Sequence, residues 1–265
     1  MQLVRSMLVF AGLASFVNSP TPGVRHQYIE VRLVAERSAL QPGRGMLIGL
    51  EMTPRRGWHG YWSNPGESGL APIVKWSAPR GVHFGPLRHP APTLMQVMGL
   101  TSYVHGGPHV LLAQMQLDRN VPVGTALPIV ADVTMAACSD RLCVPQKARL
   151  QLQLKAGSGA LSPDAAALNR ALENEPKSVP AGTFKVERRK IILELPPSAR
   201  VDPLKVHFFP DENGYWNAAE GRVVSRNPLV LAGDKQGPAP ARISGVLSDG
   251  TRTYQIVFRA ADRRR

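Results

Sequence analysis

The sequence predicts an all-β protein, with an antiparallel sandwich followed by a second, smaller β-sandwich-like domain. The 265 residues include 24 glycines and 24 prolines, well above the usual combined share of about 12%, which disfavours long helices. Short runs of alternating apolar and polar residues recur between turn-forming residues, as in strands with one buried face. The length favours two domains, because domains commonly hold about 100–150 residues.

The first residues are typical of an export signal. A basic start at Arg5 precedes the apolar run 6–17, which suits a signal-peptide core and is too short for a bilayer span of about 20 residues. We therefore expect a signal peptide over residues 1–22 and an exported protein that is not stably inserted in the membrane. Its compartment would be oxidising, so that disulfides can form. A buried first strand or a retained membrane anchor is the alternative.

Strand patterns continue through a first domain, which we assign to residues 25–155. Each run is alternating or apolar and is bounded by turn residues, as at Pro42-Gly43. The expected strands cover residues 28–35, 45–53, 74–76, 82–84, 110–117, 126–137 and 148–154. This succession is typical of an antiparallel sandwich.

A small, polar stretch marks a domain boundary, and we assign residues 156–178 to a linker. It contains one helical pattern, over 163–175, with Pro163 near its start, where proline is favoured. Three leucines would share one face of this helix: Leu161, Leu168 and Leu172. Strands return in a second domain over residues 179–262. They cover 184–187, 191–195, 205–209, 223–224, 229–231, 242–247 and 253–258.

The formal charge of +13 is spread along the chain. Basic clusters such as Arg55-Arg56 and 188–190 are too short for a nucleic-acid interface, which would need a basic stripe interleaved with aromatic residues. We therefore expect no nucleic-acid partner, although the charge can steer an acidic protein partner. No hydrolase triad motif, phosphate loop or nucleotide fingerprint occurs in the sequence, which disfavours those enzyme classes.

The two cysteines, Cys138 and Cys143, carry the most informative chemistry. Strand patterns flank both, and Ser139-Asp140 can turn, so a hairpin would bring their Cβ atoms close enough for a disulfide. As a staple this bridge would contribute only about 2 kcal/mol on the chain-entropy model, because it closes a short loop. Three interpretations stay open: a redox-active pair, a structural disulfide, or part of a metal site. Further ligands for a metal could come from His59, His83, His89, His105 and His109.

Several ordered motifs surround the cysteines. They are GWHGYWSNPGESG at 57–69, WSAPRGV at 76–82, GPLRHPAP at 85–92, GLTSY at 99–103 and CVP at 143–145. In kind and order they resemble the motifs of the DsbD N-terminal-domain family of thiol:disulfide interchange proteins, including its ScsB-type relatives. The resemblance covers about residues 27–155. Two later segments, 208–210 and 245–247, resemble the additional β-domain of the ScsB-type relatives.

The resemblance implies an immunoglobulin-like sandwich that uses a redox-active disulfide and no other cofactor. It implies that Cys143 forms mixed disulfides with partners and that Cys138 resolves them. The implied function is a periplasmic protein-disulfide reductase, an electron relay that serves periplasmic partner proteins. Residues 1–265 contain no membrane conduit and no CxxC thioredoxin-like domain. We therefore expect thioredoxin-like redox proteins and a separate membrane electron donor protein as partners.

The resemblance also implies a cap loop that shields the cysteines, here residues 93–99. Val97 or Met98 would cover the sulfurs and Gly99 could act as a hinge. The full expected set is Met95, Val97, Met98, Gly99 and Tyr103. Familiar cap loops carry an aromatic residue where this chain has methionine. Plain packing of the methionines in a surface loop is the alternative.

Other residues near the motifs have two interpretations each. Trp58, Tyr61 and Trp62 could border the site or could pack in the core and turns. The glycines of segment 57–69 indicate a tightly turning loop. Arg141 lies inside the cysteine loop and could stabilise a thiolate, which Asp140 opposes; a solvated turn residue is the alternative.

Two other classes of function remain open. A periplasmic copper-binding or copper-tolerance module could use thiol, thioether and imidazole ligands. The available ligands are Met95, Met98, His105, His109, Met115, Cys138 and Cys143. A redox-silent adaptor would keep the sandwich only for protein binding.

Overall fold

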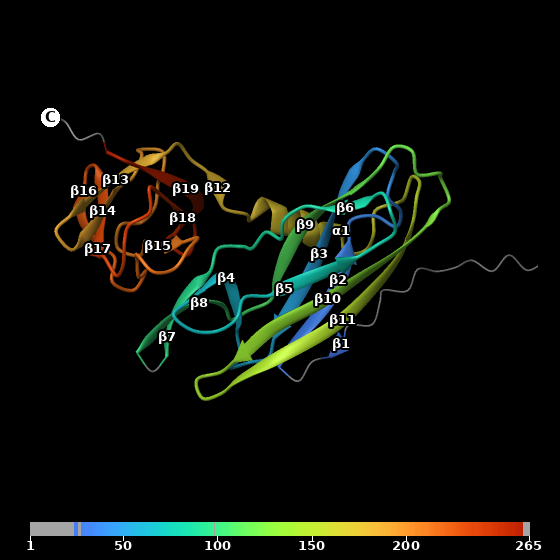
Figure 1. The fold of residues 1–265 in the computed structure, drawn as a ribbon, viewed down its shortest axis with the longest axis horizontal. Coiled ribbons are helices and arrows are strands. Elements are labelled where there is room, and N and C mark those ends of the chain that lie inside the picture. Colours follow the sequence, from blue (N-terminus) through green and yellow to red (C-terminus); the bar gives the residue numbers. More distant parts are fainter. Residues whose placement is uncertain (1–23, 26–27, 98, 262–265) are drawn as a thin grey trace, which may run out of the picture.

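A computed structural model of the chain describes residues 24–25, 28–97 and 99–261. The expected signal peptide over residues 1–22 lies outside the described residues. Figure 1 shows two groups of strands side by side, the first blue to yellow-green and the second orange to red, with α1 (Ala165–Glu173) between them in the chain. The predicted all-β class is confirmed. None of the described helical segments is long and apolar enough to cross a membrane.

Two antiparallel sheets pack face to face in the first β-domain. Their strand orders are β1-β2-β3-β9-β6 and β11-β10-β5. The larger sheet consists of β1 (Val24–Arg25), β2 (Ile29–Ala35), β3 (Gly45–Pro54), β9 (His109–Leu117) and β6 (Val82–Phe84). The smaller consists of β11 (Cys143–Lys155), β10 (Ala126–Cys138) and β5 (Ile73–Ser77). Apolar side chains from both sheets meet in one core, with Ile29, Leu50 and Ile129 fully buried.

A third sheet of the first domain has the order β4-β8-β7. It consists of β4 (Gly60–Gly66), β8 (Leu100–His105) and β7 (Thr93–Val97). The expected turning loop within 57–69 is therefore largely a strand, and the expected cap loop is part of a β-hairpin. The glycines and the proline of β4 are turn-forming residues, so the sequence did not predict a strand there. The structure accommodates the Asn-Pro-Gly step because the pairing of β4 with β8 shifts register between Tyr61 and Gly66.

The linker helix α1 covers the outer face of the larger sheet. Leu168 is fully buried there and packs with Val34, Leu47 and Leu112. The predicted three-leucine face is wrong for the other two positions, because Leu161 and Leu172 are 59% and 40% exposed.

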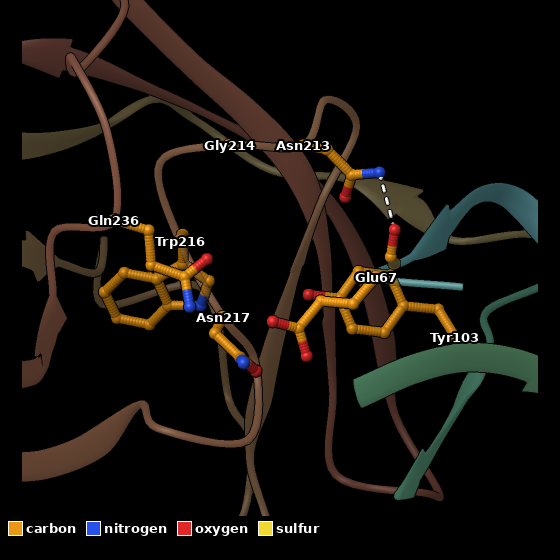
Figure 2. Close-up of a pocket in the computed structure, with 8 residues that line it drawn as sticks. Glu67, Tyr103, Asn213, Gly214, Trp216, Asn217 and Gln236 are labelled. Carbon is orange, nitrogen blue, oxygen red and sulfur yellow. Dashed lines mark hydrogen bonds between the residues drawn. The ribbon is translucent and has the colours of Figure 1, made fainter. Parts of the chain in front are cut away.

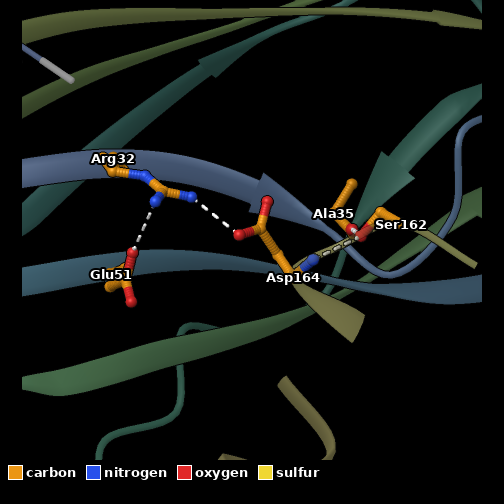
Figure 3. A network of polar contacts seen from close by, with 5 residues as sticks. All are labelled: Arg32, Ala35, Glu51, Ser162 and Asp164. Carbon is orange, nitrogen blue, oxygen red and sulfur yellow. Dashed lines mark hydrogen bonds and ion pairs between the residues drawn. The ribbon is translucent and has the colours of Figure 1, made fainter. Parts of the chain in front are cut away.

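Polar contacts fasten the start of this helix to the larger sheet (Figure 3). Arg32 of β2 donates to the Asp164 carboxylate at 2.7 Å and lies 3.4 Å from Glu51 of β3. The hydroxyl of Ser162 donates to the carbonyl of Ala35 and accepts from the Asp164 amide. The linker is therefore part of the folded first domain.

The second β-domain has one continuous hydrogen-bonded sheet. Its order is β15-β18-β19-β13-β14-β17-β16, and β12 pairs with β19. The strands are β12 (Lys177–Ser178), β13 (Gly182–Glu187), β14 (Lys190–Glu194), β15 (His207–Pro210), β16 (Arg222–Arg226), β17 (Leu229–Asp234), β18 (Arg242–Ser248) and β19 (Thr253–Ala260). It encloses a core of its own, where Phe208, Trp216 and Phe258 are buried.

Candidate functional site

The two cysteines lie at the tip of the long β10–β11 hairpin. Cys138 ends β10, Cys143 begins β11, and the two residues face each other in the ladder. They form a disulfide with an S–S distance of 2.01 Å. The Ser139 amide donates to the Leu142 carbonyl at 2.8 Å, and the Ser139 hydroxyl accepts from two loop amides. The predicted hairpin and disulfide are both present.

The two sulfur-bearing residues differ in exposure. Cys138 is 1% exposed, and its amide and carbonyl are paired with the carbonyl and amide of His59 at 3.0 and 2.9 Å. Cys143 is exposed. Cys143 is therefore the half of the disulfide that faces solvent, whereas Cys138 is covered by protein.

Tyr61 of β4 is the polar side chain that meets the disulfide. Its hydroxyl lies 3.7 Å from Cys143 Sγ, and its ring is 2% exposed. Burial raises the pKa of Tyr61 above its usual value, so the hydroxyl stays protonated at neutral pH and can donate to a Cys143 thiolate. The ring also packs edge-on against His59 with centroids 5.4 Å apart. Burial lowers the pKa of His59, so this imidazole stays neutral.

The backbone conformation and surroundings of Gly69 explain why the 57–69 motif ends in glycine. Its φ is +93°, and a Cβ at this position would overlap the ring of Tyr61. Only glycine combines this backbone conformation with this close approach. The end of the motif therefore positions Tyr61 against the disulfide.

The β7–β8 hairpin lies over the buried cysteine. Met95 packs against a small cluster made of Tyr61, Val104, Ala136 and Cys138. Sequence reasoning did not find Val104 and Ala136. The alternation of β10 puts Ala136 on the same face as Asp132 and Thr134, and β8 is buried on both faces, so it shows no alternation. Met98 and the side chain of Val97 lie outside the described part of the chain, so their shielding stays a prediction. Gly99 is exposed with φ +81°, a conformation that suits a turn; its role as a hinge also stays a prediction.

Residues 30–155 match the family model described as thiol:disulfide interchange protein DsbD, N-terminal. This region belongs to the DsbD N-terminal-domain family. The match confirms the resemblance carried by the sequence motifs. A search of curated proteins gave no match to the chain.

Comparison with solved structures shows a likeness in fold that continues past residue 155, the end of the DsbD N-terminal match. The N-terminal periplasmic domain of ScsB from Proteus mirabilis aligns with a TM-score of 0.68 at 19% identity, covering 91% of this chain and 98% of that one. The shared fold therefore includes the second β-domain. The major pilin subunit BcpA of Bacillus cereus has a TM-score of 0.29 at 10% identity, with coverages of 88% and 70%, which is too low to support an argument.

Three of the aromatic residues predicted near the site of the DsbD N-terminal domain lie elsewhere. Trp58 stacks on Tyr28 with ring centroids 3.6 Å apart, at the edge of the main core. Trp62 and Tyr103 pack together with Phe209 of the second domain. The expectation that Tyr103 shields the sulfurs is therefore wrong, because strand alternation turns it to the opposite face of β8 from Val104.

Arg141 is an exposed turn residue. Its side chain is 90% exposed, and its guanidinium lies 3.8 Å from the carboxylate of Asp140. Arg141 therefore fits the interpretation as a solvated turn residue better than a role in stabilising a thiolate. A charge that is surrounded by water and lies beside a carboxylate has only a weak effect on the pKa of a neighbouring thiol.

Among the described residues, the ligands named for a copper site do not converge as a set, although His105 and His109 are neighbours. Both cysteines are joined in the disulfide, and Met115 is fully buried in the main core. His105 stacks between His109 and His89, with ring centroids 4.3 and 6.3 Å away. Across the described ranges, no group of three or more His, Cys, Asp or Glu side chains is arranged to hold a metal ion.

Proposed function

We propose that this protein is an exported thiol:disulfide interchange protein that passes electrons through Cys138 and Cys143 to periplasmic partners. The observation that carries the proposal is the unequal exposure of the two bonded cysteines, with Cys138 1% exposed and Cys143 open to solvent. Thiol–disulfide exchange needs one sulfur that a partner can attack and a second sulfur beside it that resolves the mixed disulfide. Membership of residues 30–155 in the DsbD N-terminal-domain family supports the same chemistry.

In the loading half-reaction a donor protein reduces the disulfide. A donor thiolate attacks Cys143 Sγ, the Cys138–Cys143 bond breaks, and Cys138 leaves as a thiolate that takes up a proton. The second thiol of the donor then attacks its own sulfur in the mixed disulfide and releases Cys143 as a thiolate. The donor departs with a disulfide, and the cysteine pair holds the two electrons.

In the unloading half-reaction the electrons pass to an oxidised partner. The Cys143 thiolate attacks a partner disulfide and forms a new mixed disulfide, while the displaced partner sulfur takes up a proton. Cys138, once deprotonated, attacks Cys143 Sγ, releases the second partner sulfur and restores the original bond. Tyr61 assists by donating its O–H to the Cys143 thiolate, which stabilises the attacking form.

We infer the class of partner from the family. A donor with a CxxC pair on a thioredoxin-like domain, itself supplied by a membrane protein, provides the dithiol that the first half-reaction needs. The ScsB neighbour is a periplasmic domain, which supports the periplasm as the compartment. The exposed cysteine at a hairpin tip also suits docking against a concave partner.

The reduction potential of the Cys138–Cys143 pair tests the proposal. Oxidised protein would be equilibrated in graded thiol buffers and its free thiols counted. A value between about −120 and −270 mV is expected for an exchange protein. A value below about −300 mV would mark a structural disulfide and overturn the proposal in favour of a redox-silent adaptor.

Trapping variants test the roles of the two cysteines. Cys138→Ala should accumulate a mixed disulfide with a reactive donor, because the resolving sulfur is absent. Cys143→Ala should not, because the remaining sulfur is buried. Equal trapping by the two variants would contradict the assigned roles.

A further inference from the structure

We propose that the second β-domain controls access to Cys138, the buried half of the disulfide, by holding the sheet β4-β8-β7 against it. That this control regulates thiol–disulfide exchange rests on the proposed function. The coupling between the second domain and the cover over Cys138 does not. The sheet lies between Cys138 and the second domain, and it has a distinct set of contacts on each of its two faces.

One face of this sheet covers Cys138. Each strand contributes one side chain to it: Tyr61 from β4, Val104 from β8 and Met95 from β7. Tyr61 and Val104 are 2% and 0% exposed, and they pack with Cys138. A reagent or a partner can therefore reach Cys138 only if this sheet moves.

The other face packs on the second domain. Each strand again contributes one side chain: Trp62 from β4, Tyr103 from β8 and Leu94 from β7. They meet Phe209, Ala218 and Val246. The rings of Trp62 and Tyr103 stand edge-on to Phe209, with centroids 6.4 and 5.3 Å away. All three rings are at most 3% exposed, so this contact is a packed core between the domains.

Hydrogen bonds fix the position of the sheet on the second domain. The buried Asn64 side chain donates to the carbonyl of Pro210 at 2.7 Å. The amide of Ala218 donates to the Tyr103 hydroxyl at 3.2 Å, also in a buried position. A third bond runs from the Asn213 side chain to the carbonyl of Gly66 at 2.8 Å. It lies beside a pocket of about 160 Å³ that Asn213, Tyr103 and Trp216 help to line (Figure 2).

The two faces are coupled because their residues are neighbours in the chain. Trp62 follows Tyr61, Tyr103 precedes Val104, and Leu94 precedes Met95. Successive side chains of a strand point to opposite faces. The backbone pairing of Tyr61 with Val104 and of Leu94 with Tyr103 joins the three strands. Lifting the sheet from Cys138 therefore disturbs the packing on Phe209, and loosening that packing makes the lift easier.

The test measures access to Cys138 in the full chain. In a Cys143→Ser background, Cys138 is the single thiol, and its alkylation by iodoacetamide reports how often the covering sheet opens. Phe209→Ala should raise the alkylation rate about tenfold, because it removes the ring shared by Trp62 and Tyr103. Tyr103→Phe, which removes only the hydroxyl that accepts from Ala218, should raise it about threefold.

Two controls separate coupling from general loss of stability. Phe208→Leu reduces packing in the second domain's own core, on the opposite face of the same strand. Val224→Ala changes a 60% exposed residue of edge strand β16. Both should leave the rate within twofold of the parent. Unchanged alkylation in folded Tyr103→Phe and Phe209→Ala proteins overturns the proposal; if Phe209→Ala does not fold, Tyr103→Phe decides alone. Because the assay involves no exchange with a partner, it can fail while the proposed function stands, and the reverse also holds.

Discussion

Replacing Tyr61 by phenylalanine tests how the site stabilises its attacking thiolate. The substitution removes the hydroxyl that lies 3.7 Å from Cys143 Sγ and keeps the ring that packs against Gly69. We therefore expect the fold and the cover over Cys138 to persist while the thiolate loses a donor. The effect should appear in the reduced protein, where Cys143 ionises.

The expected magnitude follows from the contact. A hydrogen bond to a charged group contributes about 1.5–3 kcal/mol, and one pKa unit corresponds to about 1.4 kcal/mol. The contact to sulfur is long, so the lower end applies, and Tyr61→Phe should raise the pKa of the Cys143 thiol by about 1 unit. Burial raises the pKa of Tyr61 itself, so the tyrosine does not titrate in the range of the measurement.

The assay is the pH dependence of Cys143 alkylation in a Cys138→Ala background, so that a single thiol is titrated. Tyr254→Phe is the matched control, because its hydroxyl meets the Arg200 carbonyl in the second domain. A Tyr61→Phe protein with a native circular dichroism spectrum and an unchanged thiol pKa would refute the role of this hydroxyl.

Three further predictions concern stability, each measured by urea unfolding. Gly69→Ala should destabilise the protein by about 1–3 kcal/mol, because φ is +93° and a Cβ would overlap Tyr61. The control is Gly57→Ala, where φ is +82° and nothing lies near the Cβ, and it should lower the free energy of unfolding by about 1 kcal/mol. Equal losses in the two variants would refute the role of the Tyr61 ring. Leu168→Ala should cost about 2–5 kcal/mol, while Leu172→Ala, at 40% exposure, should cost under about 1 kcal/mol; similar values would contradict the packing of α1. Burial lowers the pKa of His89 to about 4. The folded protein therefore favours the neutral imidazole, and its contribution to the free energy of unfolding is fully present above the unfolded pKa of about 6.5. This contribution is lost as the pH falls toward 4, by up to about 3 kcal/mol. Burial also lowers the pKa values of His105 and His109, so His89→Gln should reduce this loss between pH 6.5 and 4 without abolishing it. An unchanged slope would show that His89 does not contribute.

The sequence by itself determined the parts of this protein that depend on local order. Alternation identified most strands of both domains, because a half-buried strand must repeat its apolar residues with a period of two. It also predicted the cysteine hairpin, since two strand patterns separated by a short turn can only fold back on each other. The ordered motifs within 57–145 were sufficient to predict the family.

Only the tertiary structure decided what each face of a strand meets. Alternation separates Tyr61 from Trp62 and Tyr103 from Val104, but it does not say which of them meets the disulfide. That choice depends on Phe209, which lies more than a hundred residues away in the chain and belongs to another domain. The exposure of Cys143 beside a buried Cys138 likewise comes from the cover supplied by β4, β7 and β8. Contacts between residues so distant in sequence are set by packing in three dimensions, so no local pattern records them.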